Sequence, residues 1–228
     1  MKLTYFGHSA FRFEIGGVDI LLDPFITGNI HAEGVVTADS LSPDFILLTH
    51  AHGDHWGDTA EIATRSGAKV VANFEITQYL SENHGHSNVQ PLNTGGSWKF
   101  EWGRVTQTYA RHSSAFPDGT YGGNPNGFMI EADGKVIYAM GDTGPFSEME
   151  WLAQDYDIDM ALMPIGDCFT MGPAASIRAA NMIRAGVTIP IHYNTFPLIE
   201  VDTSEWERLM ADAGHRTRVL TPGETIEI

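Results

Sequence analysis

The spacing of hydrophobic and polar residues in the first fifty positions predicts short strands rather than helices. We expect strands over residues 2–7, 10–16 and 18–24, with Gly16 and Gly17 forming the hairpin turn between the last two. Residues 44–50, with the sequence DFILLTH, are apolar at consecutive positions. Such a run predicts a strand that is buried on both faces.

Helical spacing first appears after the buried strand. Helices are predicted over residues 58–67, 74–85, 147–156, 173–186 and 203–214, several of them ending at glycine. Further strands are predicted over residues 69–73, 97–111, 127–142, 158–166, 187–193 and 216–228, with a hairpin turn at Asp133-Gly134. A strand-rich start followed by alternating strands and helices indicates a mixed α+β and α/β fold, with helices on the outer faces of sheets. No linker interrupts the pattern, so residues 1–228 are expected to form a single domain.

Composition and charge narrow the classes of partner. The chain is 43% hydrophobic and 18% charged, which is a globular balance, and its formal net charge is -16. An acidic surface repels phosphate backbones, so nucleic acid is not expected as a partner. With Cys168 alone, no disulfide forms within the chain, and we expect that thiol to be buried. With no apolar leader or membrane-length apolar run, we expect a cytoplasmic protein without a membrane span, and self-association into a homo-oligomer stays open.

The densest polar motif follows directly after the strand at 44–50. His50, His52, Asp54 and His55 place four nitrogen and oxygen ligands at the carboxyl end of that strand. Imidazole and carboxylate together favour divalent metals such as zinc, iron or nickel. Four ligands from so short a stretch do not readily serve one tetrahedral ion. We therefore expect His50 and His52 on one metal and Asp54 and His55 on a second, roughly 3.5–4 Å away.

The motif THAHGDH resembles the signature of the metallo-β-lactamase superfamily. Four other elements of that family have counterparts in the same order: Asp23 in LLDPF, His112 in TYARHSS, Asp142 in YAMGDTG and His192 in IPIHYNT. The resemblance runs over essentially the whole chain. It implies a four-layer αβ/βα sandwich, in which two mixed sheets are flanked by helices and the metals lie at one edge between the sheets.

The resemblance also implies a complete ligand set. One metal would be bound by His50, His52 and His112, and the other by Asp54, His55 and His192, while Asp142 would bridge the two ions. The expected cofactor is two divalent ions, zinc first, with manganese and iron as the alternatives.

Several segments are similar to one branch of the superfamily. YFGHSAFRFE, LLDPFITGN, GNPNGFMIE and PIGDCFTMGP resemble the ascorbate-6-phosphate lactonases and, more distantly, the phosphodiesterases that act on N-acyl-phosphatidylethanolamine. This branch implies that His8 lies near the metals, in contact with substrate or with a ligand. Asp23 is expected to orient a ligand histidine by hydrogen bonding, and Asp167 and Thr170 to contact substrate.

We therefore expect a binuclear hydrolase of the esterase, lactonase or phosphodiesterase type. A metal-bound, bridging hydroxide would attack the ester, lactone or phosphodiester of a small-molecule substrate, phosphorylated in one alternative. Asp54 is the expected catalytic residue, orienting the nucleophile and passing its proton to the leaving group. Two alternatives stay open, an iron-dependent redox protein handling oxygen or sulfur on the same scaffold, and a metallo-nuclease. A second His-x-His motif, His84 and His86, is assigned to a solvated loop.

Overall fold

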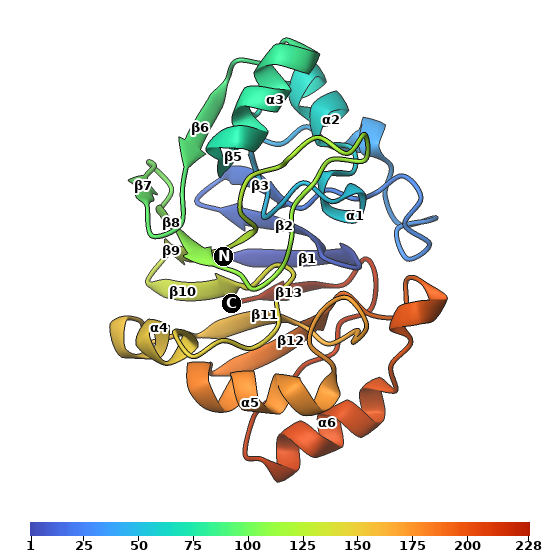
Figure 1. Cartoon of the computed structure of the whole chain (residues 1–228), viewed down its shortest axis with the longest axis vertical. Helices are drawn as coiled ribbons and strands as arrows, with labels where there is room; N and C mark the ends of the chain where they lie inside the picture. The colour runs from blue at the N-terminus through green and yellow to red at the C-terminus, as the bar shows by residue number, and fades with distance from the viewer.

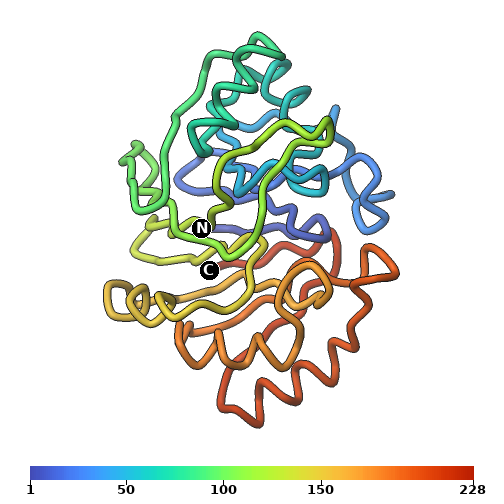
Figure 2. The backbone as a smooth tube through the Cα atoms, in the orientation of Figure 1, coloured from blue at the N-terminus to red at the C-terminus, as the bar shows by residue number.

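Two β-sheets form the centre of the computed structural model, which describes residues 1–228. The first sheet has seven strands in the order β13-β1-β2-β3-β4-β5-β6, and the second has six in the order β12-β11-β10-β9-β8-β7. Figure 1 shows helices on the outer side of both sheets. Both chain ends lie close together near the middle of the molecule, where β1 and β13 pair (Figure 2).

In the first sheet, β1 to β3 are antiparallel and β3 to β6 are parallel. Its strands are β1 Lys2–Gly7, β2 Ala10–Ile15, β3 Val18–Leu22, β4 Phe45–Leu47, β5 Lys69–Asn73, β6 Val89–Leu92 and β13 Thr225–Glu227. The helical segments of this half are η1 Ala38–Ser40, α1 Gly53–Trp56, α2 Thr59–Ser66 and α3 Phe74–His84.

In the second sheet, β7 to β10 are antiparallel and β10 to β12 are parallel. Its strands are β7 Ser97–Lys99, β8 Arg104–Tyr109, β9 Asn126–Ala132, β10 Lys135–Ala139, β11 Met160–Pro164 and β12 Val187–Ile191. The helical segments of this half are α4 Met149–Asp155, α5 Pro173–Ile183, η2 Pro197–Ile199 and α6 Thr203–Asp212. All helices are too short or too polar to cross a membrane.

Three hydrophobic clusters correspond to the three interfaces of a four-layer sandwich. The central cluster of 23 buried residues, including Phe13 and Phe128, lies between the two sheets. A second cluster packs the first sheet against α2 and α3, and a third packs the second sheet against α4, α5 and α6. Trp206 of α6 is fully buried there, and its indole nitrogen donates to Ser176 Oγ of α5 at 2.9 Å. The predicted fold class, two mixed sheets between helical layers, is confirmed.

Four local predictions were wrong. The strand expected over 97–111 is a hairpin, because Phe100 N donates to Gly103 O and turns the chain between β7 and β8. The strand expected over 216–228 is limited to β13, since a turn over 221–224 interrupts it. His86 is buried, and one ring nitrogen lies 2.8 Å from Ala68 O, so it is not in a solvated loop. Cys168 is exposed rather than buried.

Candidate metal centre

The histidine motif continues from the end of β4 into a single helical turn. His50 follows the strand closely, and His52 stands immediately before α1, where its carbonyl accepts the backbone N–H groups of His55 and Trp56. Asp54 and His55 lie on α1 itself. One turn of helix therefore projects these ligands from the carboxyl edge of the first sheet.

The second sheet supplies the remaining three residues of the predicted set. His112, Asp142 and His192 follow β8, β10 and β12 respectively, so they lie at the edge where the parallel strands β10 and β12 end. Arg111 N donates to Thr143 Oγ1 at 2.9 Å, which holds the His112 segment beside Asp142. The chain thus brings all seven predicted ligands together, from both sheets.

The side chains form two groups that meet at Asp142. His50 Nε2 and His112 Nε2 lie 3.0 and 3.3 Å from His52 Nδ1. On the other side, Asp54, His55 and His192 form a group together with His8, with ligand atoms within 4.8 Å of one another. Asp142 reaches both, and the distances to its oxygens are 3.1 Å from His55 Nε2, 3.0 Å from His192 Nε2, 3.5 Å from His112 Nε2 and 3.9 Å from His50 Nε2.

The donor and acceptor pattern fits metal ions at these positions. His55 Nδ1 bonds Asp23 and therefore carries the proton of the neutral imidazole. His55 Nε2 then has an unprotonated lone pair, which faces Asp142 Oδ1. Both facing atoms are buried and have no hydrogen-bond partner. Two acceptors at contact distance need a cation between them, either a proton or a metal ion.

The pKa shifts of the clustered side chains also indicate a site for cations. Burial would raise the pKa of Asp142, but the charges of the nearby His192 and His55 outweigh it, so the pKa falls well below its usual range. Burial would likewise lower the pKa of His192, yet Asp142 and a bond to Asp54 raise it to about 9. The pKa of His55 is also raised, because Asp142 and Asp23 together overcome its burial. The buried carboxylates therefore create a site that favours cations.

Asp23 holds Thr49 and His55 in place by hydrogen bonds. It is 1% exposed, and its two oxygens accept hydrogen bonds from Thr49 N at 2.8 Å, Thr49 Oγ1 at 2.7 Å and His55 Nδ1 at 2.8 Å. These bonds fix the ring of His55 and direct its Nε2 toward Asp142. Thr49 was not predicted as the partner of Asp23.

His8 lies against the Asp54 side of the cluster. It is fully buried, with Nε2 3.2 Å from Asp54 Oδ2 and Nδ1 2.9 Å from Thr195 Oγ1. Burial, followed by the nearby His192, lowers the pKa of His8 to about 4, so the ring is neutral at physiological pH. Sequence reasoning missed Thr195, whose contact with His8 arises only because the β1–β2 hairpin and the segment after β12 meet in the fold.

Asp167 and Thr170 lie at the same edge but outside the cluster. Their loop follows β11 and is held beside Asp142 by Met171 N, which donates to Thr143 O at 3.0 Å. Asp167 is exposed, and the side chain of Thr170 bonds only Met171 O within its own loop. Neither residue bonds any of the seven clustered side chains. A role in contacting substrate stays a prediction.

Three cluster residues adopt a left-handed backbone conformation that is rare outside glycine. The φ angles are 57° at His8, 44° at Asp23 and 56° at His192. Each of the three residues directly follows the end of a strand, β1, β3 and β12 respectively. Backbone strain of this kind gathers at functional sites, where the surrounding contacts hold it in place.

Comparison with known proteins gives concordant results. A family model described as "Beta-lactamase superfamily domain" matches residues 19–193. A UPF0173 metal-dependent hydrolase from Salinibacter ruber is 48% identical over 225 residues, covering 99% of both chains. Another from Shouchella clausii is 46% identical over 234 residues and covers both chains completely.

A solved structure extends the match to three dimensions. Igni18, a metallo hydrolase from the archaeon Ignicoccus hospitalis, has 39% sequence identity and a TM-score of 0.88, over 100% of this chain and 98% of that one. The family model covers most of the chain, and the relatives match it from end to end. The resemblance of the THAHGDH motif is thereby confirmed, and this chain belongs to the metallo-β-lactamase superfamily.

Proposed function

We propose that this protein is a hydrolase that works with two divalent metal ions. The observation that supports this most directly is the junction at Asp142, whose carboxylate lies between two groups of ligand atoms. His50, His52 and His112 would hold one ion, and Asp54, His55 and His192 the other, with Asp142 shared. An imidazole-rich set favours zinc, and manganese and iron remain alternatives. The names of the related metal-dependent hydrolases support the same activity.

Asp54 is the proposed catalytic residue. Bound divalent ions supply Lewis acidity and lower the pKa of water. Although burial raises the pKa of Asp54, its bonds to His192 and His8 lower it overall, so the carboxylate stays ionised at neutral pH. Its side chain is 26% exposed, whereas Asp142 is 2% exposed, so Asp54 is the acid that incoming water and substrate can reach. It would orient the attacking water and pass its proton to the leaving group.

The surroundings favour a small ester or lactone as substrate. The rings of Phe25 and Phe196 lie edge-on to His8, at centroid distances of 5.7 and 5.6 Å, and both are half-buried. They provide apolar surface next to His8, which in turn contacts Asp54. Arg111, exposed next to His112 and free of acidic partners, is the group available for a phosphate on a phosphorylated substrate. A phosphodiester is the second candidate, because Arg111 could also pair with its phosphate.

Replacing His52 with alanine tests the metal requirement. We expect about two equivalents of metal in the wild type, a marked loss in His52→Ala and a parallel loss of ester or lactone hydrolysis. Elemental analysis and a panel of lactone, ester and phosphodiester substrates provide the readouts. His215→Ala is the matched control, because the side chain of His215 bonds only Asn181 and lies outside the cluster. Full metal content in His52→Ala would contradict the assignment, and redox-active iron without hydrolysis would favour the alternative of a redox protein.

Metal binding is expected to release protons. Without metal the pKa of His192 is about 9 and that of His55 is also raised, so both rings are protonated at pH 7.5. A metal must displace these protons, and we expect about two to be released per chain. Calorimetric titration of the metal-free protein with zinc, in two buffers of different ionisation enthalpy, measures that number. Release of none at pH 7.5 would contradict the protonation of these two rings in the metal-free protein.

A further inference from the structure

A cavity of about 670 Å³ lies at the opposite edge of the second sheet from the metal centre. It is lined by Lys135, Met160 and Val187, the first residues of β10, β11 and β12, whereas Asp142 and His192 follow the last residues of β10 and β12. Each strand is five residues long, so the length of the sheet separates the two places. The cavity is therefore independent of the metal centre, and its size suits a small organic ligand.

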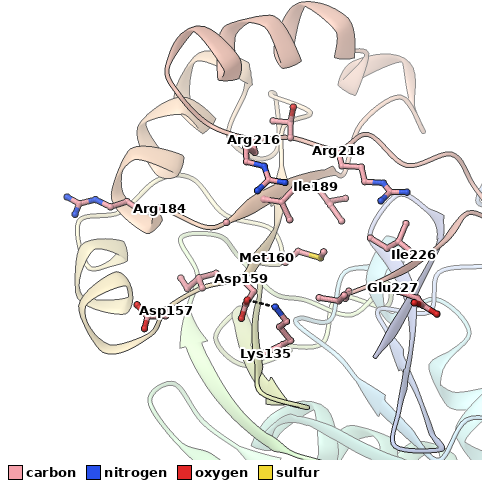
Figure 3. A pocket seen from close by; sticks show the side chains of 15 residues that line it. Lys135, Asp157, Asp159, Met160, Arg184, Ile189, Arg216, Arg218, Ile226 and Glu227 are labelled. Carbon is pink, nitrogen blue, oxygen red and sulfur yellow. Dashed lines mark hydrogen bonds and ion pairs between the residues drawn. The ribbon is translucent and has the colours of Figure 1, made fainter.

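Cations are concentrated in this cavity although the chain as a whole is acidic. Four of the 13 lysines and arginines line it: Lys135, Arg184, Arg216 and Arg218. Two are already paired, Lys135 with Asp159 at 2.9 Å and Arg218 with Glu224 at 2.9 Å. Figure 3 shows the guanidinium of Arg184 pointing away from the cavity. Arg216 is thus the one cation that faces the cavity without a partner in the chain.

The segment that carries Arg216 is fixed to the edge of β12. Thr188 N donates to Arg216 O at 2.9 Å, and Arg218 N donates to Thr188 O at 3.0 Å. In Figure 3, Arg216 and Lys135 lie on opposite sides of the hollow, with Met160 and Ile189 between them. Ile226 of β13 closes the cavity from the first sheet. The unpaired guanidinium of Arg216 therefore lies next to the apolar side chains of Met160, Ile189 and Ile226. Its backbone is held by hydrogen bonds, so a ligand would not have to order it.

The charged residues that line the cavity favour a ligand with a single negative charge. Asp157 and Glu227 also line the cavity, and Asp159 neutralises Lys135. One free guanidinium can accept a carboxylate in a bidentate pair, while the neighbouring carboxylates repel a dianion such as a phosphate monoester. We propose that this cavity binds a small organic carboxylate, with its head on Arg216 and its hydrocarbon part against Met160, Ile189 and Ile226.

Calorimetric titration of the metal-loaded protein with octanoate tests the proposal. We expect one molecule to bind per chain, and Arg216→Gln to weaken the affinity about tenfold or more, because a charged hydrogen-bonded pair is lost. Arg178→Gln is the matched control, since Arg178 is an exposed arginine of α5 outside the cavity. Octanol, which has the same chain without the charge, is expected to bind at least tenfold more weakly than octanoate.

Three results would overturn the proposal. One is the absence of octanoate binding to the wild type. Another is unchanged affinity in Arg216→Gln, which would place the carboxylate on the metal ions or on other parts of the surface. The third is octanol binding as tightly as octanoate, because the guanidinium would then contribute nothing. Arg216 is exposed, so its replacement is expected to leave the melting temperature unchanged, which thermal unfolding of both variants checks.

Discussion

Asp142→Asn is expected to lower the metal content of both sites at once and to reduce hydrolysis by more than about a hundredfold. Replacing a residue that only supports a ligand typically costs 10- to 100-fold in metal affinity, and a shared ligand should cost at least that. Asparagine keeps the size of the side chain but removes the charge that faces His55 and His192. It also directs an N–H group or a neutral oxygen at each imidazole nitrogen.

Elemental analysis together with rates on the best substrate measures the effect of Asp142→Asn. Asp44→Asn is the control, because Asp44 is an exposed aspartate that accepts one backbone hydrogen bond from Asp19. A variant at position 142 that still binds two equivalents of metal would contradict the shared site. Loss of a single equivalent would show that Asp142 serves only one ion.

Asp23→Ala is expected to lower the free energy of unfolding by about 3 kcal/mol or more even without metal. The substitution removes the partner of Thr49 N and of His55 Nδ1. It also removes one of the two partners of Thr49 Oγ1, which keeps His50 Nδ1 at 3.0 Å. Residues 49 and 55 are fully buried, so water cannot easily replace the lost bonds. Metal affinity should fall as well, since the ring of His55 would be free to turn.

Urea unfolding in the presence of a chelator isolates the structural part of this effect in Asp23→Ala. Asp44→Ala, which removes one exposed hydrogen bond, is expected to change the free energy of unfolding by less than about 1 kcal/mol. Similar values for both variants would show that the bonds of Asp23 are not important for folding. Asp23→Asn can keep an acceptor for Thr49 N and should recover part of the stability.

Local sequence was most informative where the ligands are close together in the chain. His50, His52, Asp54 and His55 fall within six positions, and the strand before them is apolar throughout, so their common placement followed from periodicity and strand-end geometry. The remaining ligands, such as His112 and His192, are single histidines in ordinary surroundings. Only the family resemblance singled them out before the fold was known.

The features that could not be predicted from the sequence depend on how segments pack in the fold. Thr195 reaches His8 across 187 positions, and neither residue has a neighbour that signals the pairing. His86 looked solvated because its neighbours are polar, yet its ring enters the structure to meet Ala68 O. Cys168 looked buried because of its residue type, but it lies in an exposed loop after β11. Residue type and local polarity do not determine the exposure of a loop residue, since tertiary packing decides it.

The origin of the ligands in both sheets has a consequence for the unfolded chain. A bound ion would tie His50 and His52 of the first half to His112 of the second, and its neighbour would tie Asp54 and His55 to His192. Such ties act as reversible cross-links between segments far apart in sequence, in the way that disulfides restrict an unfolded chain in secreted proteins. In a protein whose one cysteine excludes an internal disulfide, the metals would take over that part of fold stabilisation.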